Sequence, residues 1–285
     1  MSVATRPGRR PRQRRVLGGD APAVSRAAAP PWQPVDCHAH TTFSDGHLSV
    51  DELIAVARKR RVRPSVTDHI SSYMDSAVRT VDETRAYLDD LAHYDVFRGG
   101  EFCWHDTLWR ELPDDLVRRF THRVGSLHGI WMPDGTLVYA FSRRFPDATP
   151  DEYMDAHVAN LERFAREMPV DILAHPTLLP MTLRRLPLEE LWSEPREERA
   201  VRALAEAGIA FEISNRYRPH ERFVRRAVAA GARISLGSDG HSEEQIADLA
   251  YPLALARSIG VRDEDLYDPQ RHGSRTGFFD AGTRA

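Results

Sequence analysis

The sequence is poor in cysteine, in lysine and in long apolar runs, and each shortage excludes a class of protein. Two cysteines, Cys37 and Cys103, are too few for a disulfide framework, so a reduced cytoplasmic protein is the default expectation. No run approaches the roughly 18 apolar residues of a membrane span, so no membrane contact is expected. Lysine occurs once, at Lys59, and arginine supplies almost all positive charge, which lowers the weight of any single arginine.

What the chain does contain is enough for one large folded domain. Its 285 residues are 41% hydrophobic and 28% charged, as in a globular protein. Residues 1–31 hold seven arginines and one aspartate (+6), so with a total of −3 the remaining residues carry −9. We expect a disordered basic tail over 1–31, a folded domain over 32–270 and a C-terminal tail over 271–285. Contact of the basic tail with nucleic acid is the alternative to simple disorder.

Short apolar runs alternate with segments of helical spacing. Seven runs are expected to form strands: 35–40, 64–67, 96–102, 124–130, 171–174, 210–214 and 232–236. Six segments are expected to contain helices: 48–60, 80–94, 150–168, 195–207, 219–230 and 242–259. Residues 131–150 resemble an inserted hairpin or lid. This order predicts an α/β fold with parallel strands, but periodicity alone does not separate an open sheet from a closed barrel.

The most informative stretch is Asp36-Cys37-His38-Ala39-His40. On a strand, residues i and i+2 point to the same face, so His38 and His40 can aim their imidazoles at one point. Neutral imidazole is the commonest metal ligand among side chains. An isolated H-x-H pair is weak evidence for a metal site, and its value here depends on the rest of the chain.

Similar residues recur where the expected strands end. Residues able to bind a metal lie at six strand ends or on the loop after the first strand: His38, His40, Asp45, His69, Glu101, His128, His175, Asp239 and His241. Taken singly, His128 reads better as a core or surface residue, and Asp45-Gly46 as a turn. Chance is a poor explanation for the presence of metal-binding residue types at six strand ends. The ends of all these strands come together in one place only if the sheet closes into a ring. The pattern therefore favours a closed barrel with a metal site at the carboxyl ends of its strands.

These motifs resemble those of the polymerase and histidinol phosphatase (PHP) superfamily. Four motifs carry the resemblance: Asp36-x-His38-x-His40 with Ser44-Asp45-Gly46, Thr67-Asp68-His69, Gly100-Glu101 followed by His128, and Ser238-Asp239-Gly240-His241 with His175 before it. They cover roughly residues 34–245. The resemblance implies a distorted, TIM-like seven-stranded β/α barrel and a stand-alone phosphoesterase, because no polymerase module is recognisable.

The resemblance also implies three divalent ions per chain, of zinc, manganese or iron. One ion would lie between His38, His40, Glu101 and Asp239, a second would take Glu101, His128 and His175, and a third Asp45, His69 and His241. Asp239, His241, His69 and Glu101 are expected to act in catalysis as well. Asp36 and Asp68 are expected to orient imidazoles from behind.

The expected activity is hydrolysis of a small phosphomonoester by a metal-bridging hydroxide. No nucleophile motif of the G-x-S-x-G kind is present. Arg216, Arg184 and His105 are the candidate substrate-binding residues, since arginine suits phosphate. The alternative is a phosphodiesterase or nuclease acting on nucleotides or short oligonucleotides, which the basic tail mildly favours although nucleic acid is not the preferred partner. A non-catalytic, metal-stabilised binding module is a third possibility.

Overall fold

The helix starts follow the capping signals of the sequence. In the computed structural model, which describes residues 32–274, Ser49 and Glu52 form a reciprocal capping box at α1 (Val50–Lys59), and Thr149 does the same with Glu152 at α5 (Pro150–Glu167). The remaining longer helices are α2 (Val81–Leu91), α7 (Glu194–Ala207), α8 (Glu221–Ala229) and α9 (Ala250–Ser258). The predicted tail over 1–31 and residues 275–285 lie outside the described residues.

Some helical segments were not predicted because they are too short to show a period. These are α3 (Leu108–Glu111), α4 (Asp114–Val117), α6 (Leu188–Leu191), a 3₁₀ turn (Asp263–Asp265) and α10 (Pro269–His272). Helix α10 crosses the expected domain boundary at residue 270. The segment 242–259, predicted to contain the last helix, contains α9, which begins after residues 242–249.

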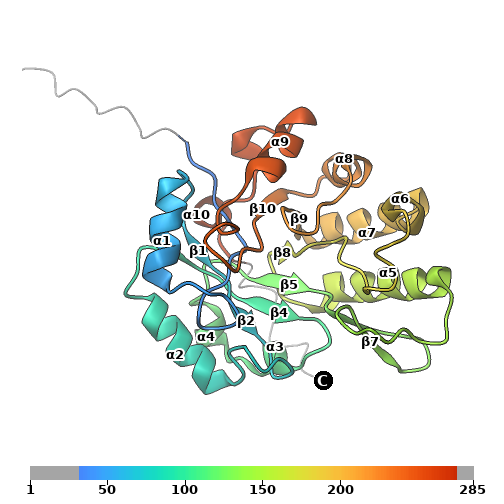
Figure 1. Ribbon diagram of the computed structural model, residues 1–285, viewed down its shortest axis with the longest axis horizontal. Coiled ribbons are helices and arrows are strands. Elements are labelled where there is room, and N and C mark those ends of the chain that lie inside the picture. Colours follow the sequence, from blue (N-terminus) through green and yellow to red (C-terminus); the bar gives the residue numbers. More distant parts are fainter. Residues whose placement is uncertain (1–31, 275–285) are drawn as a thin grey trace, which may run out of the picture. The chain divides into compact units, whose positions relative to one another are not determined.

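Six strands form a parallel sheet in the order β10-β9-β8-β5-β4-β2. Their bounds are β2 (His69–Ile70), β4 (Glu101–Cys103), β5 (Val124–Ser126), β8 (Ile172–Leu173), β9 (Ala210–Ser214) and β10 (Ile234–Gly237). Two further short strands, β1 (Ser65–Val66) and β3 (Phe97–Arg98), pair in parallel as a separate two-stranded sheet. The predicted α/β class with a mainly parallel sheet is confirmed, and α5, α7 and α8 pack side by side along one flank (Figure 1).

Two predicted strands are each divided in two, and the run 64–67 contains only β1, with β2 following outside it. The run 96–102 becomes β3 and β4, separated by Gly99-Gly100. The run 124–130 becomes β5 and then β6 (Gly129–Trp131), which turns away to pair with β7 (Leu137–Tyr139) as an antiparallel hairpin. Hydrophobic runs identify where strands lie but not where the chain bends within them.

The segment 35–40, predicted as the first strand, forms only isolated parallel bridges at Val35 and Ala39. Its backbone is nevertheless bonded on both sides: the N–H of Cys37 donates to the Leu236 carbonyl, and the N–H of Thr67 donates to the Ala39 carbonyl. Side chains interrupt the ladder, because the N–H of Ala39 donates to Thr67 Oγ1 at 2.7 Å. The segment therefore lies between β10 and β1 without being a regular strand.

The hairpin β6–β7 is attached to the outer helix by one amide. Asn160 on α5 accepts hydrogen bonds from Trp104 Nε1 at 2.9 Å and from the N–H of Trp131 at 3.1 Å, and its Nδ2 donates to the Trp131 carbonyl at 2.8 Å. A buried amide bound by three partners fixes the hairpin relative to α5 and β4. No helix among residues 32–274 is long and apolar enough to cross a bilayer.

Candidate metal centre

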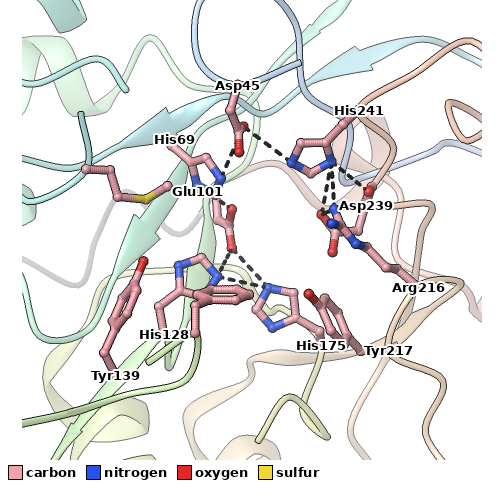
Figure 2. A pocket seen from close by; sticks show the side chains of 12 residues that line it. Asp45, His69, Glu101, His128, Tyr139, His175, Arg216, Tyr217, Asp239 and His241 are labelled. Carbon is pink, nitrogen blue, oxygen red and sulfur yellow. Dashed lines mark hydrogen bonds and ion pairs between the residues drawn. The ribbon is translucent and has the colours of Figure 1, made fainter. Parts of the chain in front are cut away.

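The structure brings all nine predicted ligands together at the carboxyl ends of the strands. Four overlapping groups have candidate ligand atoms within 4.8 Å of one another: His40, Asp45, His69 and His241; His38, His40 and Asp239; His38, Glu101 and His175; and His69, Glu101 and His128. Figure 2 shows seven of these side chains pointing into one cavity. Residues separated by up to 203 positions in the chain thus share one centre.

Glu101 lies at the centre of the cluster of candidate ligands. Its side chain is fully buried, and its two oxygens are surrounded by imidazoles. Five ring nitrogens lie near them: His38 Nε2 at 3.4 Å, His40 Nε2 at 3.7 Å, His69 Nδ1 at 2.8 Å, His128 Nε2 at 3.3 Å and His175 Nε2 at 3.1 Å. One carboxylate is therefore placed to be shared by more than one ion.

Strand register explains part of this convergence. His69 on β2 is the direct parallel partner of Glu101 on β4. On the other side of the site, the N–H of Asp239 donates to the His38 carbonyl at 2.8 Å, which brings the first and last motifs together. Gly237 permits the approach, because a Cβ there would lie 2.1 Å from Glu212 Oε1.

Backbone strain also coincides with the site. His175 has φ +28° and Asp239 has φ +51°, conformations that residues other than glycine rarely adopt. Such conformations persist where surrounding structure holds them, and they occur often at functional positions. Each residue lies two positions after a strand, His175 after β8 and Asp239 after β10, and each side chain points into the cluster (Figure 2).

The chemistry of the donor atoms fits divalent metal ions. Five buried atoms of the cluster have no hydrogen-bond partner: His38 Nε2, His40 Nδ1, His40 Nε2, His69 Nδ1 and Glu101 Oε2. Three of these nitrogens lie 2.8 to 3.7 Å from Glu101 Oε2. Buried polar atoms are normally hydrogen-bonded, so a group of unpartnered ones facing each other indicates a missing partner. Imidazole and carboxylate together suit zinc, manganese or iron.

The electrostatics of the cluster are strongly coupled. Burial alone would raise the pKa of Glu101, but His69, His128 and His38 hold it well below its usual range. Burial alone would lower the pKa of His69, yet Glu101 and Asp45 raise it to about 10. Burial and the neighbouring His69 lower the pKa of His40 to about 3. Opposite shifts in adjacent imidazoles are typical of a functional site.

The group of His40, Asp45, His69 and His241 is the most open of the four. Asp45 has a side chain about a third exposed, and its Oδ1 lies 3.4 Å from His69 Nε2 and 3.3 Å from His241 Nε2. Burial alone would raise the pKa of Asp45, but hydrogen bonds from these two imidazoles lower it below its usual range. This end of the cluster faces the cavity, where a substrate can reach it (Figure 2).

A cavity of about 340 Å³ opens beside the cluster, with Tyr139, Phe141 and Tyr217 among its walls. Arg216 is the one arginine or lysine among the described residues that line it. Its Nη1 lies 2.9 Å from His241 Nδ1 and 3.8 Å from Asp239 Oδ1. The cavity thus combines a cationic group with the candidate metal centre.

The other two predicted substrate-binding residues lie elsewhere. Arg184 is behind the wall: its Nε donates to the Leu179 carbonyl at 2.7 Å, and its guanidinium lies 5.7 Å from the Phe141 ring and 5.5 Å from the Tyr217 ring. It is not among the residues that line the cavity. His105 lines a neighbouring cavity instead.

The residues expected to orient imidazoles were wrongly assigned. Asp36 accepts from the N–H and Oγ of Ser238 at 2.8 and 2.6 Å, and Asp68 accepts from the N–H and Oγ1 of Thr41 at 2.8 and 2.6 Å. Neither bonds to an imidazole. Both aspartates lie close to a motif histidine in the sequence. Their short side chains instead accept hydrogen bonds from nearby loop backbone and hydroxyl groups.

Glu212 is the carboxylate that orients a candidate ligand's imidazole, and it was not predicted from the sequence. It is fully buried on β9; its Oε1 lies 2.8 Å from His38 Nδ1, and its Oε2 accepts from the N–H of His175 at 2.6 Å. Burial alone would lower the pKa of His38, but Glu212 and Glu101 raise it well above its usual range. A glutamate inside the apolar run Ala-Phe-Glu-Ile-Ser was the available signal, since an unpaired buried carboxylate is costly.

Comparisons with known proteins now show what the chain resembles. No protein-family model matches the sequence, and no curated protein matches it. Among solved structures, the chain is similar to a histidinol phosphate phosphatase of the PHP superfamily from Lactococcus lactis, crystallised with zinc, L-histidinol and phosphate. The TM-score is 0.63 at 16% identity, covering 81% of this chain and 95% of that one. The predicted resemblance is confirmed at the level of the fold.

A second solved structure, of an uncharacterized protein, aligns over 82% of this chain and 71% of its own length. The identity is 10% and the TM-score is 0.39, too low to bear on the argument.

Proposed function

We propose that this protein is a metal-dependent phosphatase that hydrolyses small phosphomonoesters in a distorted seven-stranded barrel. The single observation that carries the proposal is Glu101, buried among five imidazoles, three of which have ring nitrogens without a hydrogen-bond partner, beside a cavity with one arginine. A multi-metal centre and a cation for phosphate are both suited to metal-dependent phosphoester hydrolysis.

Three ions, as expected from the sequence, account for all nine residues. His38, His40, Glu101 and Asp239 would hold the first, and the short separation of His128 Nε2 and His175 Nε2, 3.4 Å, supports a second with Glu101. Asp45, His69 and His241 would hold the third. When bound, such ions lower the pKa of a coordinated water and offset charge on the phosphate.

The protein's own groups bind and orient the ester. Arg216 reaches the cavity close to His241, so its guanidinium can contact phosphate oxygens in the same place as the third metal group. Burial raises the pKa of Tyr139 to about 12, and burial likewise raises that of Tyr217, so both phenols stay protonated and can donate hydrogen bonds. Asp239, His241, His69 and Glu101 remain the residues proposed to act directly at the reacting phosphate.

A protein nucleophile is not needed. Burial raises the pKa of both Cys37 and Cys103, so neither is a thiolate at neutral pH. The similar phosphatase from Lactococcus lactis, crystallised with L-histidinol and phosphate, supports a small phosphorylated substrate. The alternative of a phosphodiesterase or nuclease is mildly favoured by the basic tail, which lies outside the described residues, and no described feature favours it.

The proposal is tested by assaying hydrolysis of p-nitrophenyl phosphate and a panel of phosphomonoesters and phosphodiesters after loading with zinc, manganese or iron. We expect monoesters to be hydrolysed with at least one metal and diesters to be poor substrates. Release of inorganic phosphate is the measurement. If no metal-loaded preparation hydrolyses any monoester, the protein is not a phosphatase.

Changing Glu212 to Gln is expected to weaken metal binding by roughly 10- to 100-fold, as for other residues that orient a metal ligand. The glutamine keeps the size, but its amide nitrogen cannot accept hydrogen bonds, so either His38 or the His175 N–H loses an acceptor. Competition with a chromophoric chelator measures the affinity. Glu206→Gln, an exposed position on α7, is the matched control and should bind metal as the wild type does. Equal affinities for both variants would show that Glu212 has only a packing role.

A further inference from the structure

Asp106, on the loop after β4, is a buried carboxylate that lies outside the candidate metal centre. It is 3% exposed, and four donors surround it: the N–H and Oγ of Ser72 at 2.6 and 2.7 Å, and the N–H groups of Thr107 and Leu108 at 2.6 and 3.1 Å. Among residues 32–274, no arginine or lysine forms an ion pair with it. Buried carboxylates usually have a cationic partner, so hydrogen bonds alone stabilise this one.

These hydrogen bonds join two loops that are far apart in the sequence. Burial alone would raise the pKa of Asp106, but hydrogen bonds from Ser72, Leu108 and Ser71 lower it, so the carboxylate is ionised at neutral pH. Hydrogen bonds to an ionised acceptor are roughly twice as strong as those between neutral groups. Thr107 and Leu108 are on the same loop as Asp106, whereas Ser72 is 34 residues away. Asp106 therefore ties the loop after β2 to the loop after β4.

The loop after β2, residues 71–78, is closed at its base by backbone bonds. The N–H of Ser71 donates to the Val78 carbonyl at 3.0 Å, and the N–H of Val78 donates to the His69 carbonyl at 2.9 Å. Loops whose two ends are joined in this way are compact units, and their position depends on the few contacts they make with the rest of the fold. For this loop, the strongest such contact is the pair of bonds from Ser72 to Asp106.

The tip of this loop is weakly held, although it forms part of the cavity beside the metal centre. Met74 lines that cavity. Residues 74–77 make no hydrogen bond to any other residue within 32–274. Asp75 has one ion pair, 3.9 Å from Arg79 Nη1, and its side chain is fully exposed, so the pair adds little. The position of Met74 therefore depends on how firmly the preceding Ser72 is fixed.

We propose that Asp106 is a positioning residue that holds the loop over 71–78 in place, so that Met74 forms a wall of the cavity and contacts the bound substrate. The inference deepens the proposed phosphatase activity, and its kinetic part rests on that activity. None of the nine candidate metal ligands lies within residues 71–78. Releasing the loop should therefore weaken substrate binding and leave the metal centre unchanged.

The test compares Asp106→Asn with the wild type, both loaded with metal, by hydrolysis of p-nitrophenyl phosphate and by amide hydrogen exchange. The amide nitrogen of asparagine cannot accept hydrogen bonds, so at least one of the four donors loses its acceptor. We expect KM to rise about tenfold with kcat changed less than about twofold, because a wall contact is made equally in the ground and transition states. Exchange of residues 72–77 should become about tenfold faster. Asp89→Asn, at an exposed position on α2, is the matched control and should behave as the wild type does.

Met74→Ala separates positioning of the loop from a general loss of structure. This variant should itself raise KM, and adding Asp106→Asn to it should raise KM little further, because the effect of Asp106 acts through Met74. Ser72→Ala removes the hydroxyl bond and keeps the N–H bond, so smaller increases in KM and exchange are expected. It also tests the anchor if Asp106→Asn does not fold.

Wild-type exchange of residues 72–77 in folded Asp106→Asn and Ser72→Ala overturns the inference. So does an increase in KM from Asp106→Asn that adds in full to the increase from Met74→Ala. Exchange is measured without substrate, so it decides the anchoring role separately from activity. Failure of the metal-loaded wild type to hydrolyse any monoester overturns the phosphatase assignment itself.

Discussion

Replacing Glu101 with Gln is expected to reduce kcat for phosphomonoester hydrolysis by roughly a thousandfold or more, about 4 kcal/mol of transition-state stabilisation. Among residues 32–274, Glu101 is the one carboxylate near five imidazoles, and two of the proposed ions share it. A neutral amide at this position cannot balance two dications. The same variant should therefore also contain less metal than the wild type.

Both consequences can be measured independently. Bound metal is counted by elemental analysis of the purified protein, and activity by release of phosphate at saturating substrate. Circular dichroism checks that the variant is folded, and Glu206→Gln, at an exposed site, controls for the same chemical change. A folded Glu101→Gln protein with full metal content and wild-type kcat would contradict the assignment of Glu101 as a shared ligand.

Removing the metal ions should abolish activity and lower the melting temperature by on the order of 10 °C. The loss of stability has a specific origin. Without ions, His38 Nε2, both ring nitrogens of His40 and His69 Nδ1 have no hydrogen-bond partner, and the imidazoles around Glu101 are left close together. A metal that binds only the folded state adds roughly 4 kcal/mol to the free energy of unfolding at a thousand times its dissociation constant.

Scanning calorimetry before and after dialysis against a strong chelator measures this shift, and restoring zinc or manganese should recover both the melting temperature and phosphate release. Glu101→Gln provides the internal comparison, because its melting temperature should respond less to chelator than that of the wild type. A wild-type protein whose melting temperature and activity are both indifferent to the chelator holds no functional metal in this cluster.

The candidate centre could be predicted from the sequence because each ligand is marked by position. His38, His128 and His175 all lie where an apolar run ends, and parallel strands bring their carboxyl ends to one edge. Residue type and strand direction were therefore sufficient, even though the strands themselves are only two to five residues long. Metal identity is not encoded in this way, since imidazole and carboxylate suit several ions.

The supporting contacts could not be predicted, because they depend on side-chain direction. Asp36 and Asp68 are adjacent to the motifs, yet their carboxylates bond to loop backbone and hydroxyls. Glu212 is far from every motif and still lies 2.8 Å from His38. Arg184 follows the correct strand but supports the cavity wall from behind. Sequence spacing gives the edge on which a residue lies, and the packing of its neighbours decides where its side chain points.

The pairing of the first motif with the last also constrains when the protein can acquire its metal. His40 donates its N–H to the Gly240 carbonyl, and Asp239 donates to the His38 carbonyl, so both ends of the chain must be present to build the centre. During synthesis the first histidines leave the ribosome some 200 residues before their partner at Asp239. The nascent chain therefore lacks Asp239 and His241 for most of translation, although His69, Glu101, His128 and His175 are made earlier. A complete centre is expected only in the finished chain, after its most distant contacts have formed.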